Sequence, residues 1–379
     1  MSSVRDRFTA APRGAFADVP FAAVPDAQWN DWRWQQRERL RTIDAFERVV
    51  KLSAAERHAF SACSDRFLVA VTPYYAGLIA DDPACPIRLQ SLPHAAELDD
   101  NADELDDPLG EERYMPVPGI THRYPDRVLF YTTHNCPVYC RHCTRKRKVS
   151  AAETMPDFQQ LELGLKYIEA NSAIRDVIVS GGDPLTFSDE RLDELLSRLR
   201  AIPHVEIIRL GTRNLVTLPQ RVTPDFAAML KAHQPIYVQT HFNHPKECTQ
   251  EAFDACARLA DAGAVISNQM VLLKGINDDV EIVRALNQKL LMMRVRPYYI
   301  LQADPARGTR HFRTPVETGI EIIRGLRGHS SGLAVPHFVV DGPGGFGKVA
   351  LVPHYLESSD EGRHTFKNYR GETFEYVDP

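Results

Sequence analysis

Residues 136–143 read Cys136-Pro-Val-Tyr-Cys140-Arg-His-Cys143, and the rest of the chain can be placed around them. Shortly before them, the apolar run Val-Leu-Phe-Tyr at 128–131 predicts a buried strand. Cysteine thiolates are the usual ligands of iron–sulfur clusters. Three thiolates at CxxxCxxC spacing after a strand therefore predict a [4Fe–4S] cluster. Three of its irons would be bound, and the fourth would stay open for a further ligand.

Two other interpretations of the three cysteines stay open. A structural zinc site needs four protein ligands, and His134 or His142 is close enough in sequence to supply the fourth. A disulfide is disfavoured because residues 1–20 show no secretory signal, and proteins that stay in the cytosol rarely keep structural disulfides. Cluster ligation explains the spacing best.

The composition is that of an ordinary soluble globular protein. The chain has 379 residues, of which 44% are hydrophobic and 25% charged, with a formal net charge of −5. The small negative charge speaks against a nucleic-acid or membrane surface, and the apolar runs fall short of the ~20 residues of a membrane span. We therefore expect a cytoplasmic protein with no nucleic-acid and no membrane partner.

The chain divides into three predicted regions. Residues 1–112 form a mostly helical extension, with helices expected at 29–50 and 54–67, and end in an acidic run interpreted as a solvated boundary. Residues 113–335 alternate between strand-like and helix-like stretches, and residues 336–379 form a C-terminal segment. The predicted strands are Val128–Thr133, Asp176–Ser180, Val205–Leu210, Ile236–His241, Val265–Leu272 and Arg296–Leu301, and the predicted helices are Asp157–Ala170, Asp189–Arg200, Pro224–Ala232, Glu247–Ala262 and Val280–Met293.

This alternation predicts an α/β fold with parallel strands and right-handed crossovers. Six strand–helix units predict a partial (β/α)6 barrel rather than a closed barrel of eight units. In such folds the chemistry gathers at the carboxyl ends of the strands, and the polar motifs of this chain fall at those ends. The sequence therefore predicts one site at the mouth of the barrel.

The motif Ser180-Gly181-Gly182-Asp183 follows the second predicted strand. Glycine allows the backbone to approach a ligand closely, and the carbonyl groups and Asp183 can accept hydrogen bonds from an ammonium group. An ordinary strand-to-helix turn would have the same composition. His241 and Gln269 end the fourth and fifth strands, where each is either a ligand contact or a hydrogen-bonded core residue.

The loop at 342–348, Gly-Pro-Gly-Gly-Phe-Gly-Lys, ends in Lys348. It has the GxxxxGK spacing of a phosphate-binding loop, but Val349 stands where that loop needs a serine or threonine for magnesium. The better interpretation is a lysine presented on a glycine turn, which can bind an aldehyde cofactor covalently. A solvated lysine on a flexible loop is the alternative.

Together these motifs resemble those of the lysine 2,3-aminomutase family, radical S-adenosylmethionine (SAM) enzymes that also use pyridoxal 5′-phosphate (PLP). The resemblance runs from about residue 29 to residue 355. Besides the cysteine motif it rests on Thr121-His-Arg-Tyr-Pro-Asp-Arg-Val-Leu-Phe130, Thr240-His-Phe-Asn-His-Pro245, Arg296-Pro-Tyr-Tyr299, His311-Phe-Arg-Thr-Pro315 and Pro343-Gly-Gly-Phe-Gly-Lys348. Phe346 departs from the familiar members, which have only glycine in this run. It either narrows the site or stiffens the loop.

The resemblance implies a role for each matching residue. Cys136, Cys140 and Cys143 would hold the cluster, whose open iron would bind SAM. The amino group of SAM would lie on Ser180, Gly181, Gly182 and Asp183, while His241 and Gln269 would contact SAM or lie beside PLP. Lys348 would bind PLP covalently, with Arg123 and Arg127 as partners of the PLP phosphate.

The implied reaction is an isomerisation of L-lysine to β-lysine, in which the α-amino group migrates from C2 to C3 by radical chemistry started by SAM. Arg145 would pair with the substrate carboxylate, and Asp304 and Asp341 would grip the ε-ammonium. A substrate without a distal cation would leave both carboxylates buried and unpaired, which is costly. Arginine, ornithine or another amine is the alternative substrate. A second alternative is that the two aspartates have no substrate role and are ordinary turn and strand-end residues.

The resemblance also implies partners. The cluster must be reduced by an electron donor such as flavodoxin or ferredoxin. A homo-oligomer, either a dimer or a tetramer, is expected from the family.

Overall fold

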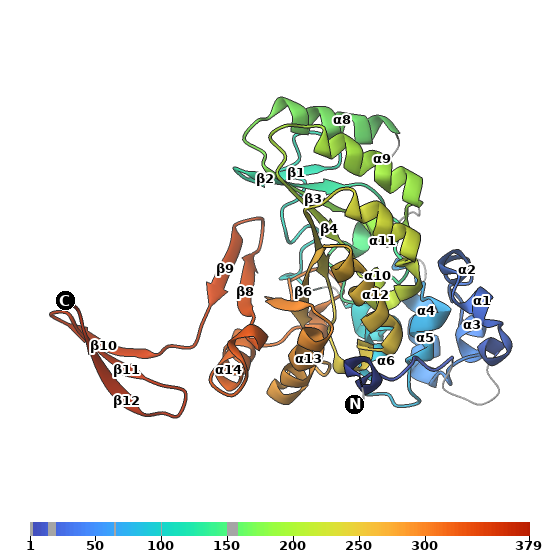
Figure 1. The fold of residues 1–379 in the computed structure, drawn as a ribbon. Coiled ribbons are helices and arrows are strands. Elements are labelled where there is room, and N and C mark those ends of the chain that lie inside the picture. The colour runs from blue at the N-terminus through green and yellow to red at the C-terminus, as the bar shows by residue number, and fades with distance from the viewer. Residues whose placement is uncertain (1–2, 14–19, 64–65, 100, 150–157) are drawn as a thin grey trace.

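The computed structural model describes residues 3–13, 20–63, 66–99, 101–149 and 158–379. The N-terminal region is built of short helices on one side of the molecule (Figure 1). These are η1 (Val4–Arg7), η2 (Pro20–Ala23), α1 (Asp26–Trp29), α2 (Trp32–Arg37), α3 (Ile43–Glu47), α4 (Ala54–Cys63), α5 (Pro73–Gly77), α6 (Pro86–Ser91) and η3 (Ala95–Leu98).

The single helix expected over 29–50 is wrong, because the chain restarts twice within it. The Asp31 side chain accepts a hydrogen bond from the Arg33 amide and caps α2, and the Thr42 side chain accepts one from the Ala45 amide and caps α3. Such side chains compete with a continuing helix and favour a new start. The helix expected at 54–67 is described as far as Cys63; residues 64–65 lie outside the described part of the chain.

Within the described residues, nine strands form one sheet in the order of the sequence. The strands β2 to β8 are parallel, and β1 and β9 pair antiparallel at the two edges. Their bounds are β1 (Ile120–Tyr124), β2 (Arg127–Tyr131), β3 (Asp176–Ser180), β4 (Ile207–Gly211), β5 (Ile236–Thr240), β6 (Val265–Leu272), β7 (Arg296–Gln302), β8 (His337–Gly342) and β9 (Gly347–Leu351).

A helix follows each parallel strand from β2 to β7 and lies on the outer side of the curved sheet (Figure 1). The main helices are α8 (Phe158–Ala170), α9 (Asp189–Arg200), α11 (Pro224–Lys231), α12 (Gln250–Asp261), α13 (Val280–Met292) and α14 (Val316–Leu326), and the shorter ones are α7 (Lys146–Val149), η4 (Pro184–Thr186), α10 (Asn214–Thr217), η5 (Pro219–Arg221), η6 (Pro245–Glu247), η7 (Arg310–Phe312) and η8 (Gly332–Ala334). The predicted start of α8 at Asp157 lies outside the described residues. Six strand–helix units confirm the predicted partial (β/α)6 barrel.

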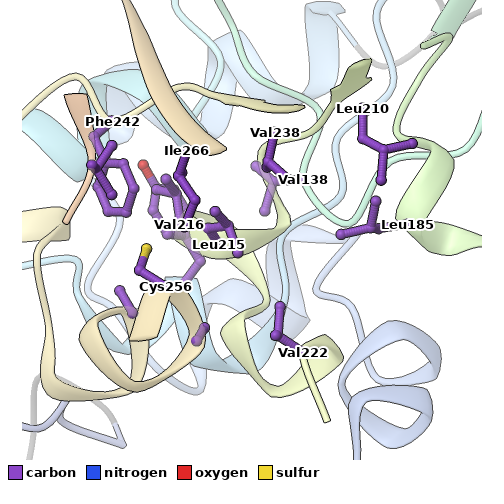
Figure 2. Close-up of a cluster of buried hydrophobic side chains, with 14 of the residues drawn as sticks. Val138, Leu185, Leu210, Leu215, Val216, Val222, Val238, Phe242, Cys256 and Ile266 are labelled. Carbon is purple, nitrogen blue, oxygen red and sulfur yellow. The ribbon is translucent and has the colours of Figure 1, made fainter. Parts of the chain in front are cut away.

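The core lies between the sheet and these helices. Apolar side chains on the helix-facing side of neighbouring strands, among them Leu210, Val238 and Ile266, are at most 3% exposed. They belong to one buried cluster with Phe242, which follows β5, and with Cys256 of α12. Figure 2 shows Ile266 near Phe242 and Leu210 beside Leu185. Val138 of the cysteine loop belongs to the same cluster. The loop is therefore anchored in the barrel core, which fixes the position of the three cysteines at the strand ends.

The acidic run before β1 is solvated only in part: Asp99, Asp103 and Asp106 are exposed, as a solvated run predicts, but three glutamates are buried. Glu97, Glu104 and Glu111 are each at most 5% exposed. We call residues 104–114 the strap, because this segment crosses the mouth of the barrel. Its Leu105 amide donates to the Pro305 carbonyl after β7 (2.7 Å), and its Pro108 carbonyl accepts from the Gly344 amide in the β8–β9 turn (2.8 Å). The strap thus joins the last strands of the barrel to the N-terminal region.

A small antiparallel sheet ends the chain and projects from the barrel on the side away from the N-terminal helices (Figure 1). It consists of β10 (Leu356–Asp360), β11 (Arg363–Lys367) and β12 (Thr373–Val377). Phe374 and Tyr376 are more than half exposed on it. Across the described residues, none of the helices has the length and apolar character needed to cross a bilayer. The domain limits at 112 and 335 stay predictions.

Candidate active site

One cavity of about 670 Å³ opens at the carboxyl ends of the parallel strands. Its volume lies in the range of small-molecule and cofactor sites. Every site residue predicted from the sequence lines it: Arg123, Arg127, Cys136, Cys140, Cys143, Arg145, Ser180, Gly181, Gly182, Asp183, His241, Gln269, Asp304, Asp341 and Lys348. The structure therefore brings all of them together.

The three cysteines lie on the loop after β2, near one another and near the cavity wall. Burial raises the pKa of the Cys143 thiol to about 11, with a further contribution from the charge of Cys140. Among the described residues, no set of three or more His, Cys, Asp or Glu side chains is arranged to hold a single metal ion. Thiolates are the usual ligands of iron–sulfur clusters, and all three cysteines face the same cavity.

The two glycines of the Ser180–Asp183 motif are required by the cysteine loop itself. A Cβ on Gly181 would overlap the backbone of Thr133, and a Cβ on Gly182 would overlap the backbone of Asn135. The Asp183 amide also donates to the Asn135 carbonyl at 2.7 Å. The motif after β3 is thus packed against the segment that leads into Cys136, a close approach that only glycine permits.

Asp183 is buried, and its carboxylate is already hydrogen-bonded within the chain. It accepts from the Thr212 hydroxyl (2.8 and 2.9 Å) and from the Arg213 amide (2.7 Å), both after β4. The aspartate therefore braces two neighbouring strand ends. The predicted contact of this motif with the SAM amino group stays a prediction, and the backbone carbonyls are the better candidates for it.

His241 and Gln269 lie on the neighbouring strand ends after β5 and in β6. Burial lowers the pKa of His241 to about 4, and the charges of Arg213 and Arg145 add to this effect. The imidazole is therefore neutral at pH 7 and can act as a hydrogen-bond donor and acceptor. The Gln269 amide donates to Gln239 Oε1 at 3.1 Å, which fixes its orientation in the cavity wall.

Lys348 lies near the start of β9. It pairs with Asp341 of β8 in the antiparallel ladder. The Lys348 Nζ forms an ion pair with Asp341 Oδ2. Arg123 Nη1 lies 3.2 Å from Asp341 Oδ1, an oxygen that is buried and has no hydrogen-bond partner among the described residues. One carboxylate oxygen of Asp341 thus already binds a primary ammonium group, and the other can accept a further hydrogen bond.

Asp304 lies after β7 in the same cavity. Burial raises its pKa to about 7, and the negative charge of Asp341 adds to the rise, while Lys348 and Arg123 oppose it. Two buried carboxylates near each other favour a bound cation. The site has the electrostatic character expected for an ammonium ligand.

The chain is similar to two family models and to known proteins. Residues 130–286 match the model of the radical SAM superfamily, and residues 323–379 match the model named lysine-2,3-aminomutase. An L-lysine 2,3-aminomutase of Clostridium subterminale is 48% identical, over 95% of this chain and 86% of that protein. The chain belongs to the lysine 2,3-aminomutase family.

Other relatives carry names with different substrates. An L-lysine 2,3-aminomutase of Bacillus subtilis is 45% identical, over 94% of this chain and 76% of that protein. A glutamate 2,3-aminomutase of Clostridioides difficile is 43% identical, over 93% of this chain and 84% of that protein. The chain is an isomerase of the radical SAM superfamily, and the family implies a [4Fe–4S] cluster and SAM as cofactors.

The cavity and its immediate surroundings also contain residues that sequence reasoning missed. Arg213, after β4, places Nη1 2.7 Å from Cys140 Sγ and Nη2 2.8 Å from the fully buried Glu247. Glu111 of the strap is bound to Arg145. Arg209 of β4 pairs with Asp176 of β3 inside the barrel. Arg209 lies in a predicted strand and Arg213 shortly after it, so their positions near a strand end could have identified both as site residues. No local sequence pattern identifies Glu111.

Phe346 does not narrow this cavity. Its side chain is 83% exposed at the β8–β9 turn and is not part of the cavity wall. Of the two effects expected for Phe346, narrowing of the site and stiffening of the loop, the structure excludes the first.

Proposed function

We propose that this chain is a PLP-dependent 2,3-aminomutase that interconverts L-lysine and β-lysine. The observation that carries the proposal is the Lys348–Asp341 ion pair. The ammonium of Lys348 is chemically the same group as the ε-ammonium of free lysine, and the chain itself places it on Asp341 beside Asp304. A cavity that accepts its own lysine side chain in this way suits a substrate with the same end group.

The residues around Lys348 fit PLP. Arg123 and Arg127 lie with their guanidinium carbons 4.9 and 3.9 Å from the ring centroid of Tyr124, at the edge of the same cavity. Lys348 would hold the cofactor covalently, and the two arginines would bind its phosphate. Each arginine also contacts a carboxylate, Asp341 for Arg123 and Asp126 for Arg127. When bound, PLP would supply a π system that stabilises the migrating radical.

The cysteine loop and its neighbours fit the cluster and SAM. The three cysteines and the Ser180–Asp183 motif form adjoining parts of one cavity wall, with His241 and Gln269 on the next strands. The carbonyls of the glycine motif would bind the amino group of SAM. The buried position would keep water from the reacting carbon.

The two ends of the substrate would be bound by side chains of opposite charge. Arg145 would bind the α-carboxylate, and Asp304 and Asp341 would bind the ε-ammonium, so that C3 is fixed between them. Glutamate would place a second carboxylate against the two aspartates, which is strongly unfavourable. Arginine, ornithine or another amine remains the second candidate, because each also carries a distal cation.

The proposal extends to partners and location. A low-potential carrier such as flavodoxin or ferredoxin would reduce the cluster. A homo-oligomer, dimer or tetramer, would form, with the exposed aromatic residues of the C-terminal sheet as its first candidate contact. We place the enzyme in the cytoplasm, with neither nucleic acid nor membrane as a partner.

The test is an anaerobic product analysis. The protein is reconstituted with iron, sulfide, PLP and SAM, reduced with dithionite, and given L-lysine, L-arginine, L-ornithine or L-glutamate separately, with products read by mass spectrometry. We expect β-lysine from wild type and none from Lys348→Ala or Cys140→Ala. The matched controls are Lys367→Ala in the C-terminal sheet and Cys256→Ala in the core.

Turnover of arginine or ornithine alone would support the proposed aminomutase reaction but would change the assigned substrate. SAM cleavage with no β-amino acid from any of the four would refute the proposal.

A further inference from the structure

Glu111 is a buried carboxylate of the strap, and no local sequence pattern distinguishes it. It is 5% exposed and lines the active-site cavity together with Arg145. Thirty-four positions separate it from Arg145 in the chain. It reaches the site because the strap is bound to the loop after β7 and to the β8–β9 turn.

The contact between the two side chains is an edge-on ion pair. Glu111 Oε1 accepts from Arg145 Nε at 2.7 Å and lies 2.6 Å from Arg145 Nη2. Glu111 Oε2 lies 3.4 Å from Lys148 Nζ. Burial alone would raise the pKa of Glu111, but Arg145 and Lys148 lower it to about 2, so the group is charged at all physiological pH values.

This contact uses one edge of the guanidinium. An arginine has five N–H donors in a planar fork, so the edge formed by Nη1 and Nη2 stays available for a second carboxylate. Glu111 also balances the charge, because one glutamate against Arg145 and Lys148 leaves one net positive charge. That charge matches a single α-carboxylate.

We propose that Glu111 is a positioning residue for Arg145 and, through it, for the α-carboxylate of the amino-acid substrate. The inference rests on the proposed function, because it assigns Arg145 to that carboxylate. Without Glu111 the long arginine side chain regains its rotamers, and its free edge no longer points to one place. Charge-assisted hydrogen bonds of this kind contribute about 1.5–3 kcal/mol, which corresponds to roughly 10- to 100-fold in affinity.

The experiment compares two ligands that differ only at the carboxylate. Binding of L-lysine and of L-lysinamide to the fully loaded but unreduced enzyme is measured by equilibrium dialysis, so that no turnover occurs. The variants are Glu111→Ala, Glu111→Gln, which keeps the shape, and Glu111→Asp, which keeps the charge. Glu112→Gln is the matched control, because Glu112 is exposed and pairs with Arg147.

We expect Glu111→Ala and Glu111→Gln to weaken L-lysine binding about 10- to 100-fold. L-lysinamide binding should change less than about threefold, Glu111→Asp should restore part of the loss, and Glu112→Gln should have no effect. If Glu111→Ala does not fold, Glu111→Gln carries the comparison alone. Equal losses for both ligands, or no loss for L-lysine, would overturn the inference. Wild-type enzyme that binds no L-lysine would instead refute the proposed function.

Discussion

Asp304 is the residue of the cavity whose charge is most sensitive to pH near neutrality. Burial and the neighbouring Asp341 raise its pKa to about 7. A cationic substrate binds the ionised carboxylate, so affinity is complete above this pKa and is lost as the pH falls through it. We expect the dissociation constant of L-lysine to rise about tenfold from pH 8 to pH 6 and to level off above pH 8. Calorimetric titration of the loaded, unreduced enzyme measures it.

Asp304→Asn is the control for this profile. The variant should bind L-lysine weakly at every pH, because the amide carries no charge to gain or lose. A wild-type profile that is flat between pH 6 and pH 8 would show that Asp304 does not face the substrate ammonium.

Substitution of Phe346 is expected to have little effect on activity. Its side chain is 83% exposed and lies outside the cavity wall, so Phe346→Gly should leave kcat and KM for L-lysine within about twofold of wild type. Lys348→Ala, two positions along the same turn, should abolish turnover. A tenfold rise in KM with Phe346→Gly would mean that the turn closes over the substrate.

At the residue scale, motif spacing predicted the wall of the cavity but not the contacts behind it. Cys136, Lys348 and Asp341 sit on strand ends or turns with a local signature. Glu111 acts through a fold-dependent contact with Arg145, and Asp183 binds Thr212 and Arg213 rather than standing free. Such partners are distant in sequence, so no local pattern reports them.

At the scale of elements, α14 and β8 fit together through one glycine. A Cβ on Gly319 of α14 would overlap the ring of Phe338 on β8, the strand that carries Asp341. Gly319→Ala should therefore lower the free energy of unfolding by about 1–3 kcal/mol, since overpacking outweighs the gain in helix propensity. Urea unfolding of the apoprotein, followed by circular dichroism, measures the change.

Gly332→Ala is the matched control, because an added Cβ there would meet no atom within 4 Å. It should stay within about 0.5 kcal/mol of wild type. Equal unfolding midpoints for both variants would show that helix α14 can shift to admit the methyl group.

The parallel strands β2 to β7 were predictable because each is a short apolar run before a polar strand end, and the bounds of β3 agree with the prediction at Asp176–Ser180. The seventh parallel strand, β8, was not among the predicted strands. The edge strand β1 was not, because Ile120–Tyr124 mixes histidine and arginine into a half-buried pattern. The expected helix at 29–50 failed because the capping side chains of Asp31 and Thr42 outweigh amphipathic spacing.

At the scale of the whole molecule, the C-terminal sheet projects from the barrel with Phe374 and Tyr376 more than half exposed (Figure 1). Exposed aromatic groups of this kind favour burial in a protein interface. We expect wild type to sediment as a dimer or tetramer and Phe374→Ser with Tyr376→Ser to shift it toward the monomer. Leu333→Ser, at a more exposed apolar site outside this sheet, should leave the assembly unchanged. A monomeric wild type would contradict the expected oligomer.

The account as a whole depends on the claim that Asp304 and Asp341 select a substrate with a distal cation. The most direct measurement is a competition in one anaerobic reaction that contains equal concentrations of L-lysine and L-glutamate, with β-lysine and β-glutamate quantified by mass spectrometry at early times. A site built around buried charges discriminates by about 10⁴ or more, so we predict β-lysine with β-glutamate below detection. Comparable amounts of both products, or an excess of β-glutamate, would contradict the claim.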